Sequence, residues 1–302
     1  MELTRRWRPD SPVDIAATLS VHRRGPNDAT QQVEAGAVWQ TCRTPEGPAT
    51  VRVTPGEDGL VQATAWGDGT AWVLDRVPGW LGEHDRPQEL RPRHPIVEHA
   101  AKRNAGLRIG RTNLIMDALV PVILEQKVTG LEARRSWQAL IRKHGEPAPG
   151  PAPRGMRVLP ASHVLRRLPS WEWHRLGVGP ERSRTIVRVA SLARSLERLA
   201  DRPSAEAMTG LQSVPGIGRW TAAEVVQRSH GDPDAVSVGD YNLPTVVAYA
   251  LAGERTADDA RMLELLEPYR GQRHRVCLLL ARSGPRPPRH GPRQALRDYR
   301  AI

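Results

Sequence analysis

The stretch Leu211-Gln-Ser-Val-Pro-Gly-Ile-Gly-Arg-Trp-Thr221 predicts a tight turn followed at once by a helix. Gly216 and Gly218 flank an apolar Ile217, so the backbone can take a positive φ and bring its N–H groups close to an anion. The N-terminus of the following helix adds free donors and a partial positive charge. We therefore interpret this turn as a phosphate-holding hairpin. The alternative interpretation is an ordinary helix–helix turn with a C-cap glycine.

The segments on both sides of this turn have helical periodicity. Apolar residues precede the turn at Ala205, Met208 and Leu211, and Val214-Pro215 stiffens its entry. The periodic residues after the turn are Trp220, Ala223, Val226 and Gln227. This pattern predicts one unit made of a helix, a hairpin and a second helix.

Composition indicates the class of partner. The chain has 302 residues, for which the size of typical domains predicts about two domains, and a formal net charge of +11. A strongly basic chain favours a polyanionic partner, most often nucleic acid. Its two cysteines lie far apart and form no metal-spaced set. No segment approaches the roughly 20 apolar residues that a membrane span needs, and the N-terminus has no apolar signal core, so we expect a cytoplasmic, nucleoid-associated protein.

The first part of the chain has the alternating pattern of strands. Period-two segments begin near Val13, Ala37, Val51 and Val61 and are separated by turns rich in Gly, Pro, Asp and Asn. Residues 71–82 change to a helical period. We predict an N-terminal antiparallel β-sheet domain with one helix, over residues 1–88.

The remainder of the chain is predicted to be all-helical. The expected helices cover residues 112–128, 130–144, 179–199, 219–229, 243–252, 256–267 and 271–282. The overall fold class is α+β, with a helical domain over residues 89–284. Residues 285–302 form a basic, Pro/Arg-rich tail that cannot build a core.

Asp240 is the candidate catalytic residue. It follows the extended segment Ala235-Val-Ser-Val238 and precedes a new helix, which is a position typical of an N-cap. Taken alone, Asp240 is expected only to cap that helix. Beside a hairpin that holds a phosphate, a fixed carboxylate is suited to stabilise the positive charge that develops on a sugar when an N-glycosidic bond breaks.

Together these segments resemble the helix–hairpin–helix DNA glycosylase superfamily, and in particular its 3-methyladenine DNA glycosylase II branch. The resemblance rests on the hairpin Leu211–Thr221, on Val238-Gly-Asp240-Tyr241, on Ile123-Leu-Glu-Gln-Lys-Val128 and on the strand-rich N-terminal part. It covers most of residues 90–284. It implies an enzyme that flips alkylated purines out of double-stranded DNA and hydrolyses their N-glycosyl bonds, without a cofactor.

The resemblance also implies roles for individual residues. The hairpin residues that it places against DNA are Val214, Gly216, Ile217, Gly218, Arg219 and Thr221. Carbonyl groups of Leu211, Val214 and Ile217 are implied to hold a monovalent cation, Na⁺ or K⁺. Members that also cut the backbone carry a lysine where this chain has Trp220, which implies a monofunctional enzyme that leaves an abasic site.

Five residues are assigned to intercalation or to the base pocket: Gln126, Lys127, Trp220, Glu224 and Tyr241. Trp220 either stacks on the base or packs in the helix core. Lys127 stands where the family has an apolar wedge, and the alternative for it is a solvated helix end. Glu224 and Ala281 replace aromatic residues of the family pocket, and a solvated position is the favoured interpretation of Glu224.

Two other functions remain open from the sequence. One is a non-enzymatic DNA-binding protein of the same fold that senses damage or structure, and the other is a glycosylase for a different class of lesion. A monomer is expected, because one protein molecule is enough to flip one base.

Overall fold

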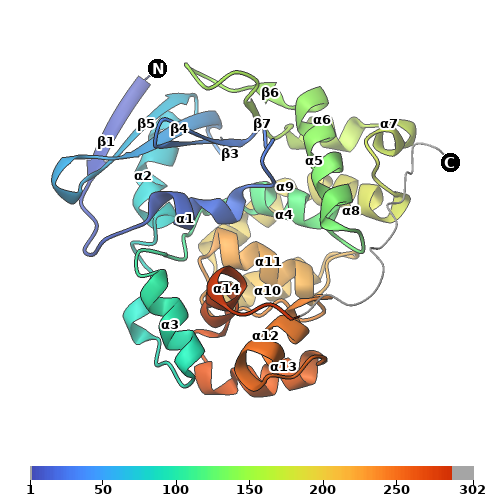
Figure 1. Ribbon diagram of the computed structural model, residues 1–302. Helices are drawn as coiled ribbons and strands as arrows, with labels where there is room; N and C mark the ends of the chain where they lie inside the picture. The colour runs from blue at the N-terminus through green and yellow to red at the C-terminus, as the bar shows by residue number, and fades with distance from the viewer. Residues whose placement is uncertain (1, 288–302) are drawn as a thin grey trace.

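The computed structural model describes residues 2–287 and consists of a strand-rich part followed by a helical part (Figure 1). The predicted α+β fold class is confirmed. The strands are β1 (Glu2–Trp7), β2 (Gln31–Glu34), β3 (Ala37–Thr44), β4 (Gly47–Pro55) and β5 (Val61–Gly67). They form an antiparallel sheet in the order β1-β5-β4-β3-β2.

Local sequence explains how this sheet is built. Ala35 and Gly36 join β2 to β3 and both have positive φ, 49° and 76°, as a two-residue hairpin turn requires. Alternate residues of β4 and β5, such as Val51 and Ala63, are buried against helix α2 (Thr70–Trp80). The strands predicted near Ala37, Val51 and Val61 are therefore confirmed, as is the helix predicted within residues 71–82.

One expectation for the N-terminal part is wrong, and one strand was missed. The segment with Val13, Ile15 and Ala17 is not a strand but contains helix α1 (Ile15–Leu19), because the Asp14 side chain accepts a hydrogen bond from the Ala17 N–H and caps it. A short 3₁₀ turn, η1 (Ser20–His22), follows. Strand β1 was not predicted from the sequence because it is an edge strand whose side chains are largely exposed, which leaves little apolar alternation to detect.

The helical part begins after a linker that contains a short turn at Pro87–Glu89. Its helices are α3 (Pro95–Arg103), α4 (Ile115–Leu124), α5 (Gly130–His144), α6 (Ser162–Arg167), α7 (Ser170–Arg175), α8 (Pro180–Ser191), α9 (Ala193–Glu197), α10 (Ser204–Gln212), α11 (Arg219–Ser229), α12 (Leu243–Ala252), α13 (Asp259–Leu266) and α14 (Arg273–Ser283). Helices α5, α11 and α12 have the predicted bounds, whereas the helix expected over 179–199 is divided into α8 and α9. A small hairpin, β6 (Glu146–Pro147) with β7 (Arg157–Val158), lies between α5 and α6.

The helices form two groups with separate cores. Helix α4 is buried along almost its whole length and lies at the centre of the larger core, among α5, α8, α9 and α11. Helices α3, α12, α13 and α14 enclose the other core, at the bottom of Figure 1. The hairpin helix α11 belongs to the first group, and α12, which follows Asp240, belongs to the second. The residues singled out in the sequence therefore lie where the two groups meet.

The predicted division into residues 1–88, 89–284 and 285–302 stays a prediction, and most of the basic tail, residues 288–302, lies outside the described residues.

Candidate DNA-binding and catalytic site

The hairpin between α10 and α11 holds its side chains inward and its backbone outward. Val214 and Ile217 are buried in the larger core, and the Ile217 N–H donates to the Val214 carbonyl at 3.0 Å. Pro215, Gly216 and Gly218 are exposed at the tip. Apolar anchors on one side thus leave peptide groups free to meet a ligand on the other. Val214 and Ile217 contribute to this surface through their peptide groups, because their side chains face the core.

The two glycines of the hairpin have different conformations. Gly216 has φ +96°, and a Cβ atom there would lie 2.4 Å from Oγ1 of Thr185 on α8. Gly218 has φ −93° and ψ −179°, which is extended backbone, so the expected positive φ is confirmed at Gly216 and wrong at Gly218. A Cβ atom on Gly218 would meet no other atom within 4 Å. Gly216 is therefore needed for the fold of the turn, whereas Gly218 leaves its outer surface open.

The N-terminus of α11 is an electropositive end. The N-cap residue of α11 is Gly218, so no N-cap side chain accepts a hydrogen bond from the first N–H groups of the helix. The first turn of the helix contains no acidic residue. The first N–H groups of any helix lack partners within the helix and carry partial positive charge. Arg219 is exposed beside them, and Nη1 of Arg188 donates to the Pro215 carbonyl at 2.7 Å. This end of α11 has the donors and the charge to bind a phosphate group.

Gln126 connects this hairpin to the turn after α4. Its Nε2 donates to the Gly216 carbonyl at 3.0 Å and to Oγ1 of Thr221 at 2.9 Å. Thr221 is itself buried, so its side chain supports Gln126 and does not reach a ligand. Lys127, the next residue after Gln126, has φ 53° and an exposed side chain, whose Nζ lies 3.8 Å from Oε2 of Glu181. The structure therefore brings Gln126 beside the hairpin, with Lys127 as the next residue of the chain, and their assigned role in intercalation stays a prediction.

Trp220 and Asp240 are in direct contact. The indole Nε1 of Trp220 donates to Oδ2 of Asp240 at 3.2 Å. The other oxygen, Oδ1, accepts from the N–H groups of Asn242 and Leu243 at 2.8 and 2.9 Å and so caps α12. The capping interpretation and the catalytic interpretation of Asp240 are thus compatible, since the cap fixes the half-buried carboxylate next to the hairpin helix.

The loop before Asp240 is fixed as well. The Gly239 N–H lies 3.1 and 3.0 Å from the two carboxylate oxygens of Asp259 on α13, and Gly239 has φ +94°. Backbone and side-chain bonds therefore hold the Asp240 carboxylate in one position, as electrostatic catalysis requires.

The assigned pocket residues have unequal environments. Tyr241 is 94% exposed, so the expectation that its side chain lines a pocket is wrong in this structure. Ala281 is exposed on α14. Glu224 is not the solvated residue that was favoured, because only 15% of its side chain is exposed and it forms an ion pair with Arg228.

The environment of Glu224 keeps it ionised. Burial raises the pKa of this carboxyl, but the Arg228 charge and hydrogen bonds from Ser237 and Arg228 outweigh burial, so the pKa is lower than usual. Arg228 was not singled out from the sequence, although it continues the four-residue spacing of Trp220 and Glu224 on α11. That periodicity is the signal that identifies it.

The carbonyls implied to hold a monovalent cation differ in their free capacity. The Val214 carbonyl accepts one backbone hydrogen bond, from the Ile217 N–H, which leaves a second lone pair on its oxygen, whereas the Leu211 carbonyl accepts from the N–H groups of both Ser213 and Val214. Gln126 and Arg188 donate to other carbonyls, those of Gly216 and Pro215. Residues 2–287 contain no group of three or more His, Cys, Asp or Glu residues arranged to hold a metal ion.

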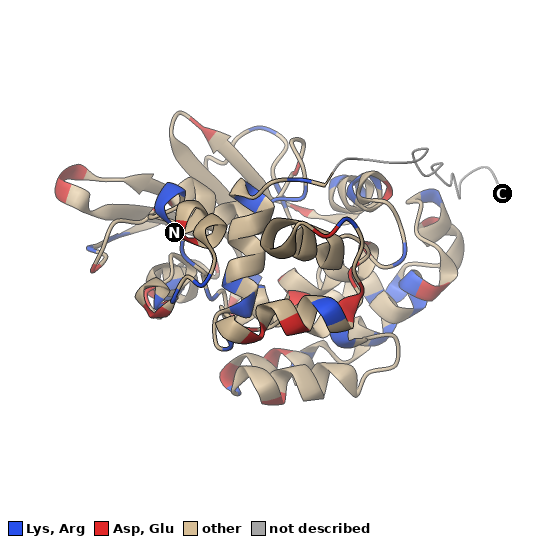
Figure 2. Cartoon of the chain, turned by 60° about the horizontal axis from the view of Figure 1, so that its bottom comes forward, with Lys and Arg blue, Asp and Glu red and all other residues tan. Residues whose placement is uncertain are grey.

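Charge is distributed over the whole described surface. Lys and Arg lie on both the strand-rich and the helical parts, with Asp and Glu among them (Figure 2). None of the described helices combines the length and the apolarity that crossing a membrane requires.

Comparisons with known proteins agree with this architecture. No protein-family model matches the chain. A curated relative from Mycobacterium tuberculosis, named as a probable bifunctional transcriptional activator and DNA repair enzyme AlkA, is 28% identical over 227 residues. The match covers 70% of this chain but only 44% of the relative, so the chain spans less than half the length of the curated relative.

Two solved structures share the fold over nearly the whole chain. A 3-methyladenine DNA glycosylase from Archaeoglobus fulgidus has a TM-score of 0.75 at 17% identity, with 92% of this chain and 98% of that chain covered. An 8-oxoguanine glycosylase/lyase from Clostridium acetobutylicum, in complex with double-stranded DNA, has a TM-score of 0.66 at 12% identity, with 89% and 90% covered. The chain therefore has the fold of the helix–hairpin–helix DNA glycosylases.

Proposed function

We propose that this protein is a monofunctional DNA N-glycosylase that removes alkylated purines, of the 3-methyladenine and 7-methylguanine type, and leaves an abasic site. The observation that carries the proposal is the position of the Asp240 carboxylate, which is hydrogen-bonded to Trp220 at the start of the helix whose N-terminus is suited to bind phosphate. The name of the curated relative and the DNA complex of a protein with the same fold support this function.

In the proposed function, the hairpin binds the DNA backbone. The N–H groups around Gly218 and the side chain of Arg219 hold one phosphate, with the monovalent cation, when bound, adding positive charge at the Leu211, Val214 and Ile217 carbonyls. Lys127 lies beside the hairpin on a left-handed turn, and its apolar stem fills the gap that a flipped nucleotide leaves in the duplex.

Bond cleavage is assigned to Asp240. As the bond between C1′ and the base nitrogen breaks, its electron pair leaves with the base and positive charge develops on the sugar. The fixed Asp240 carboxylate stabilises that charge and orients a water molecule. The water oxygen bonds to C1′, one of its protons is released, and the products are the free base and an abasic sugar.

Strand cleavage is not expected. Trp220 has no amine that could form a Schiff base with the sugar. Lys127 follows Gln126, which is hydrogen-bonded to the hairpin, so its amine is the one to consider as an alternative. Its ammonium faces Glu181 on α8 instead of the Trp220–Asp240 pair.

The test is release of free bases from methylated duplex DNA, measured by chromatography, together with strand integrity on a denaturing gel. We expect released methylated purines and abasic sites, with strands that break only after treatment with alkali. A protein that shifts the mobility of the DNA but releases no base would instead be a non-enzymatic DNA-binding protein. Strand breaks without alkali would contradict the monofunctional assignment.

A further inference from the structure

Helix α11 has one half-open polar stripe on an otherwise buried surface. Between Thr221 and Ser229 every residue is buried except Glu224 and Arg228, and with Trp220 these two form a line with a spacing of four residues. Each step along the line is about 6 Å, from the 1.5 Å rise of a helix. The stripe therefore starts beside the carboxylate of Asp240, at Trp220, and runs along α11 away from it.

Glu224 and Arg228 form the centre of a hydrogen-bonded network. Nη1 of Arg228 donates to Oε2 of Glu224 at 2.8 Å and to its main-chain carbonyl at 2.6 Å, and Nε donates to the Val21 carbonyl at 3.2 Å. Oγ of Ser237 donates to Oε1 of Glu224 at 2.5 Å, and Ser237 in turn accepts from Gln227 at 2.9 Å. Each charged group is thus fixed by partners from more than one part of the chain.

Both groups keep capacity for a ligand. An ionised carboxylate has about four lone-pair positions, and the protein uses one on each oxygen of Glu224. Within residues 2–287, Nη2 of Arg228 donates to no acceptor. The pair therefore presents a hydrogen-bond acceptor, the Glu224 carboxylate, beside a donor, Nη2 of Arg228.

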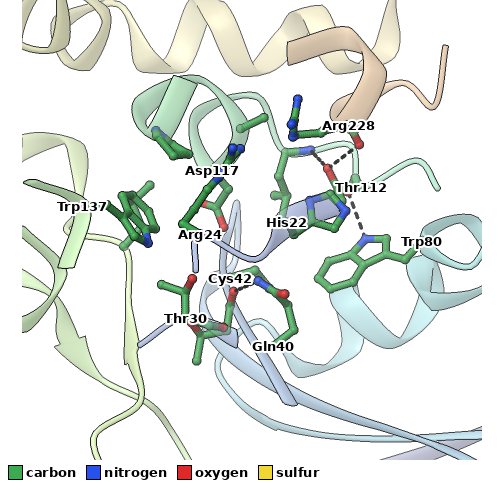
Figure 3. A pocket seen from close by; sticks show the side chains of 15 residues that line it. His22, Arg24, Thr30, Gln40, Cys42, Trp80, Thr112, Asp117, Trp137 and Arg228 are labelled. Carbon is green, nitrogen blue, oxygen red and sulfur yellow. Dashed lines mark hydrogen bonds between the residues drawn. The ribbon is translucent and has the colours of Figure 1, made fainter. Parts of the chain in front are cut away.

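The neighbours of the pair include two neutral imidazoles, a paired arginine and a buried carboxyl. A cavity of about 40 Å³ lies at the Arg228 end of the stripe, and His22 and Arg24 face it (Figure 3). Burial, with the neighbouring Arg228 charge, lowers the pKa of His22 to about 3, and burial lowers the pKa of His274 on α14 to about 4, so both imidazoles are neutral at pH 7. Arg24 is paired with Glu125 at 2.7 Å. Asp117 also lines the cavity. Because Glu224 and Arg228 carry opposite charges, recognition by the pair depends on the pattern of donors and acceptors that it presents.

We infer that Glu224 and Arg228 read the edge of the flipped base and select 6-oxopurines over 6-aminopurines. This inference rests on the proposed function and names the preferred substrate class of the same site. A 6-oxopurine offers a ring N1–H to the Glu224 carboxylate and the O6 carbonyl to the Arg228 guanidinium. A 6-aminopurine places an amino donor where the guanidinium needs an acceptor, and its N1 has no proton for the carboxylate.

Such a mismatch is costly inside a protein. A site built to hydrogen-bond a substrate discriminates strongly against an analogue that leaves its buried polar groups unpaired. Arginine contacts to the O6 side of guanine and carboxylate contacts to base N–H groups are common means of base recognition. Glu224 lies about one helical turn inward from Trp220, so a purine whose sugar lies at Asp240 can direct its far edge at this pair.

One methylated DNA preparation tests the selection directly. Duplex DNA treated with dimethyl sulfate contains both 7-methylguanine, a 6-oxopurine, and 3-methyladenine, a 6-aminopurine. We expect release of 7-methylguanine to exceed release of 3-methyladenine at least tenfold, once each rate is divided by its spontaneous rate. The double variant Glu224→Gln/Arg228→Met removes both charges and keeps an apolar stem at position 228, and it is expected to lose most of this ratio.

A matched control is available on α3. Glu98 and Lys102 form an exposed ion pair with the same four-residue spacing, at 2.6 Å. The variant Glu98→Gln/Lys102→Met should keep the wild-type ratio. A wild-type ratio near one, or an unchanged ratio in the Glu224/Arg228 variant, would overturn the inference while leaving the glycosylase proposal intact.

Binding of free bases separates the inference from the proposed function. Free hypoxanthine should raise the melting temperature of the wild-type protein more than adenine does, and the Glu224/Arg228 variant should lose this difference. This result in a protein that releases no base would overturn the proposed function, and with it the substrate class, while supporting the reading of the base edge by the pair. Equal shifts for hypoxanthine and adenine would overturn the inference whatever the catalytic result.

Discussion

The indole N–H of Trp220 donates to the Asp240 carboxylate, 20 residues further along the chain, across 3.2 Å. The same carboxylate caps α12 through its other oxygen. The Asp240 side chain therefore joins α11, in the larger helical core, to α12 in the other helical group. A residue that fixes the carboxylate proposed to carry catalysis is expected to affect the rate more than the binding of DNA.

Replacement of Trp220 by Phe tests this relationship. The variant keeps the aromatic ring and loses the donor, and hydrogen bonds to charged groups contribute about 1.5–3 kcal/mol. We expect the single-turnover rate of base release to fall roughly 10- to 100-fold, with the DNA dissociation constant changed less than about threefold. The control is Trp171→Phe, at an exposed tryptophan on α7. An unchanged rate in Trp220→Phe would show that this bond has no part in catalysis.

Gln126 is expected to hold the DNA-binding surface together. The change Gln126→Glu keeps the size of the side chain, but a carboxylate cannot donate to the Gly216 carbonyl and repels it. We expect DNA affinity to fall about tenfold and the melting temperature to fall by a few degrees. Fluorescence anisotropy with a labelled duplex measures the affinity. Full affinity in this variant would contradict the supporting role of Gln126.

The two hairpin glycines provide a matched pair. Gly216→Ala forces a Cβ into contact with Thr185 at φ +96°, and we expect a loss of about 1–3 kcal/mol in the free energy of unfolding. Gly218→Ala adds a Cβ into open space at an ordinary φ, so its stability should remain within about 0.5 kcal/mol of the wild type. Chemical denaturation compares the two. Equal losses of unfolding free energy in the two variants would show that the positive φ of Gly216 is not needed for the fold.

The buried Asp117 on α4 predicts a pH dependence of stability. Burial, with a smaller contribution from the Glu197 charge, raises the pKa of Asp117 to about 7 in the folded state, against 3.8 as its ordinary value. From pH 3.8 to 7 the unfolded chain loses this proton before the folded chain does, so the contribution of Asp117 becomes less favourable as pH rises. Above pH 7 both states are ionised and the penalty stays constant.

The variant Asp117→Asn removes this titration and can still accept the hydrogen bond from the Arg43 N–H. We expect it to raise the melting temperature by about 2–6 °C at pH 8 and by much less at pH 4. Asp75→Asn, at an exposed carboxylate on α2, is the control. A stabilisation that is equal at pH 4 and pH 8 would rule out titration of Asp117 as its cause.

The sequence was sufficient to predict the parts of the fold with strong local signals. The hairpin, with its Pro-Gly-Ile-Gly turn, and helices α5, α11 and α12 follow from periodicity and turn residues, and the strands around Val51 and Val61 follow from alternation. The error at Ile15 arises because its short apolar alternation is also compatible with a helix, and the Asp14 cap decides between them. Strand β1 forms only because β5 offers it a partner, which is a non-local cause.

The candidate site was predicted less completely, because its geometry depends on contacts between distant segments. The pairing of Trp220 with Asp240 and of Gln126 with Gly216 joins positions 20 and 90 residues apart. Glu224 was interpreted as solvated because its partners, Ser237 on a loop and the Val21 carbonyl that holds Arg228, belong to other parts of the chain.

The central claim is that the Asp240 carboxylate carries the reaction. Its most direct test is the single-turnover rate of base release from methylated duplex DNA by Asp240→Asn, measured at protein concentrations that saturate the DNA. The amide can still accept hydrogen bonds to cap α12 but carries no negative charge. We predict that the rate falls at least 100-fold while DNA affinity stays within a few-fold of the wild type. A variant that releases methylated bases at the wild-type rate would contradict the account.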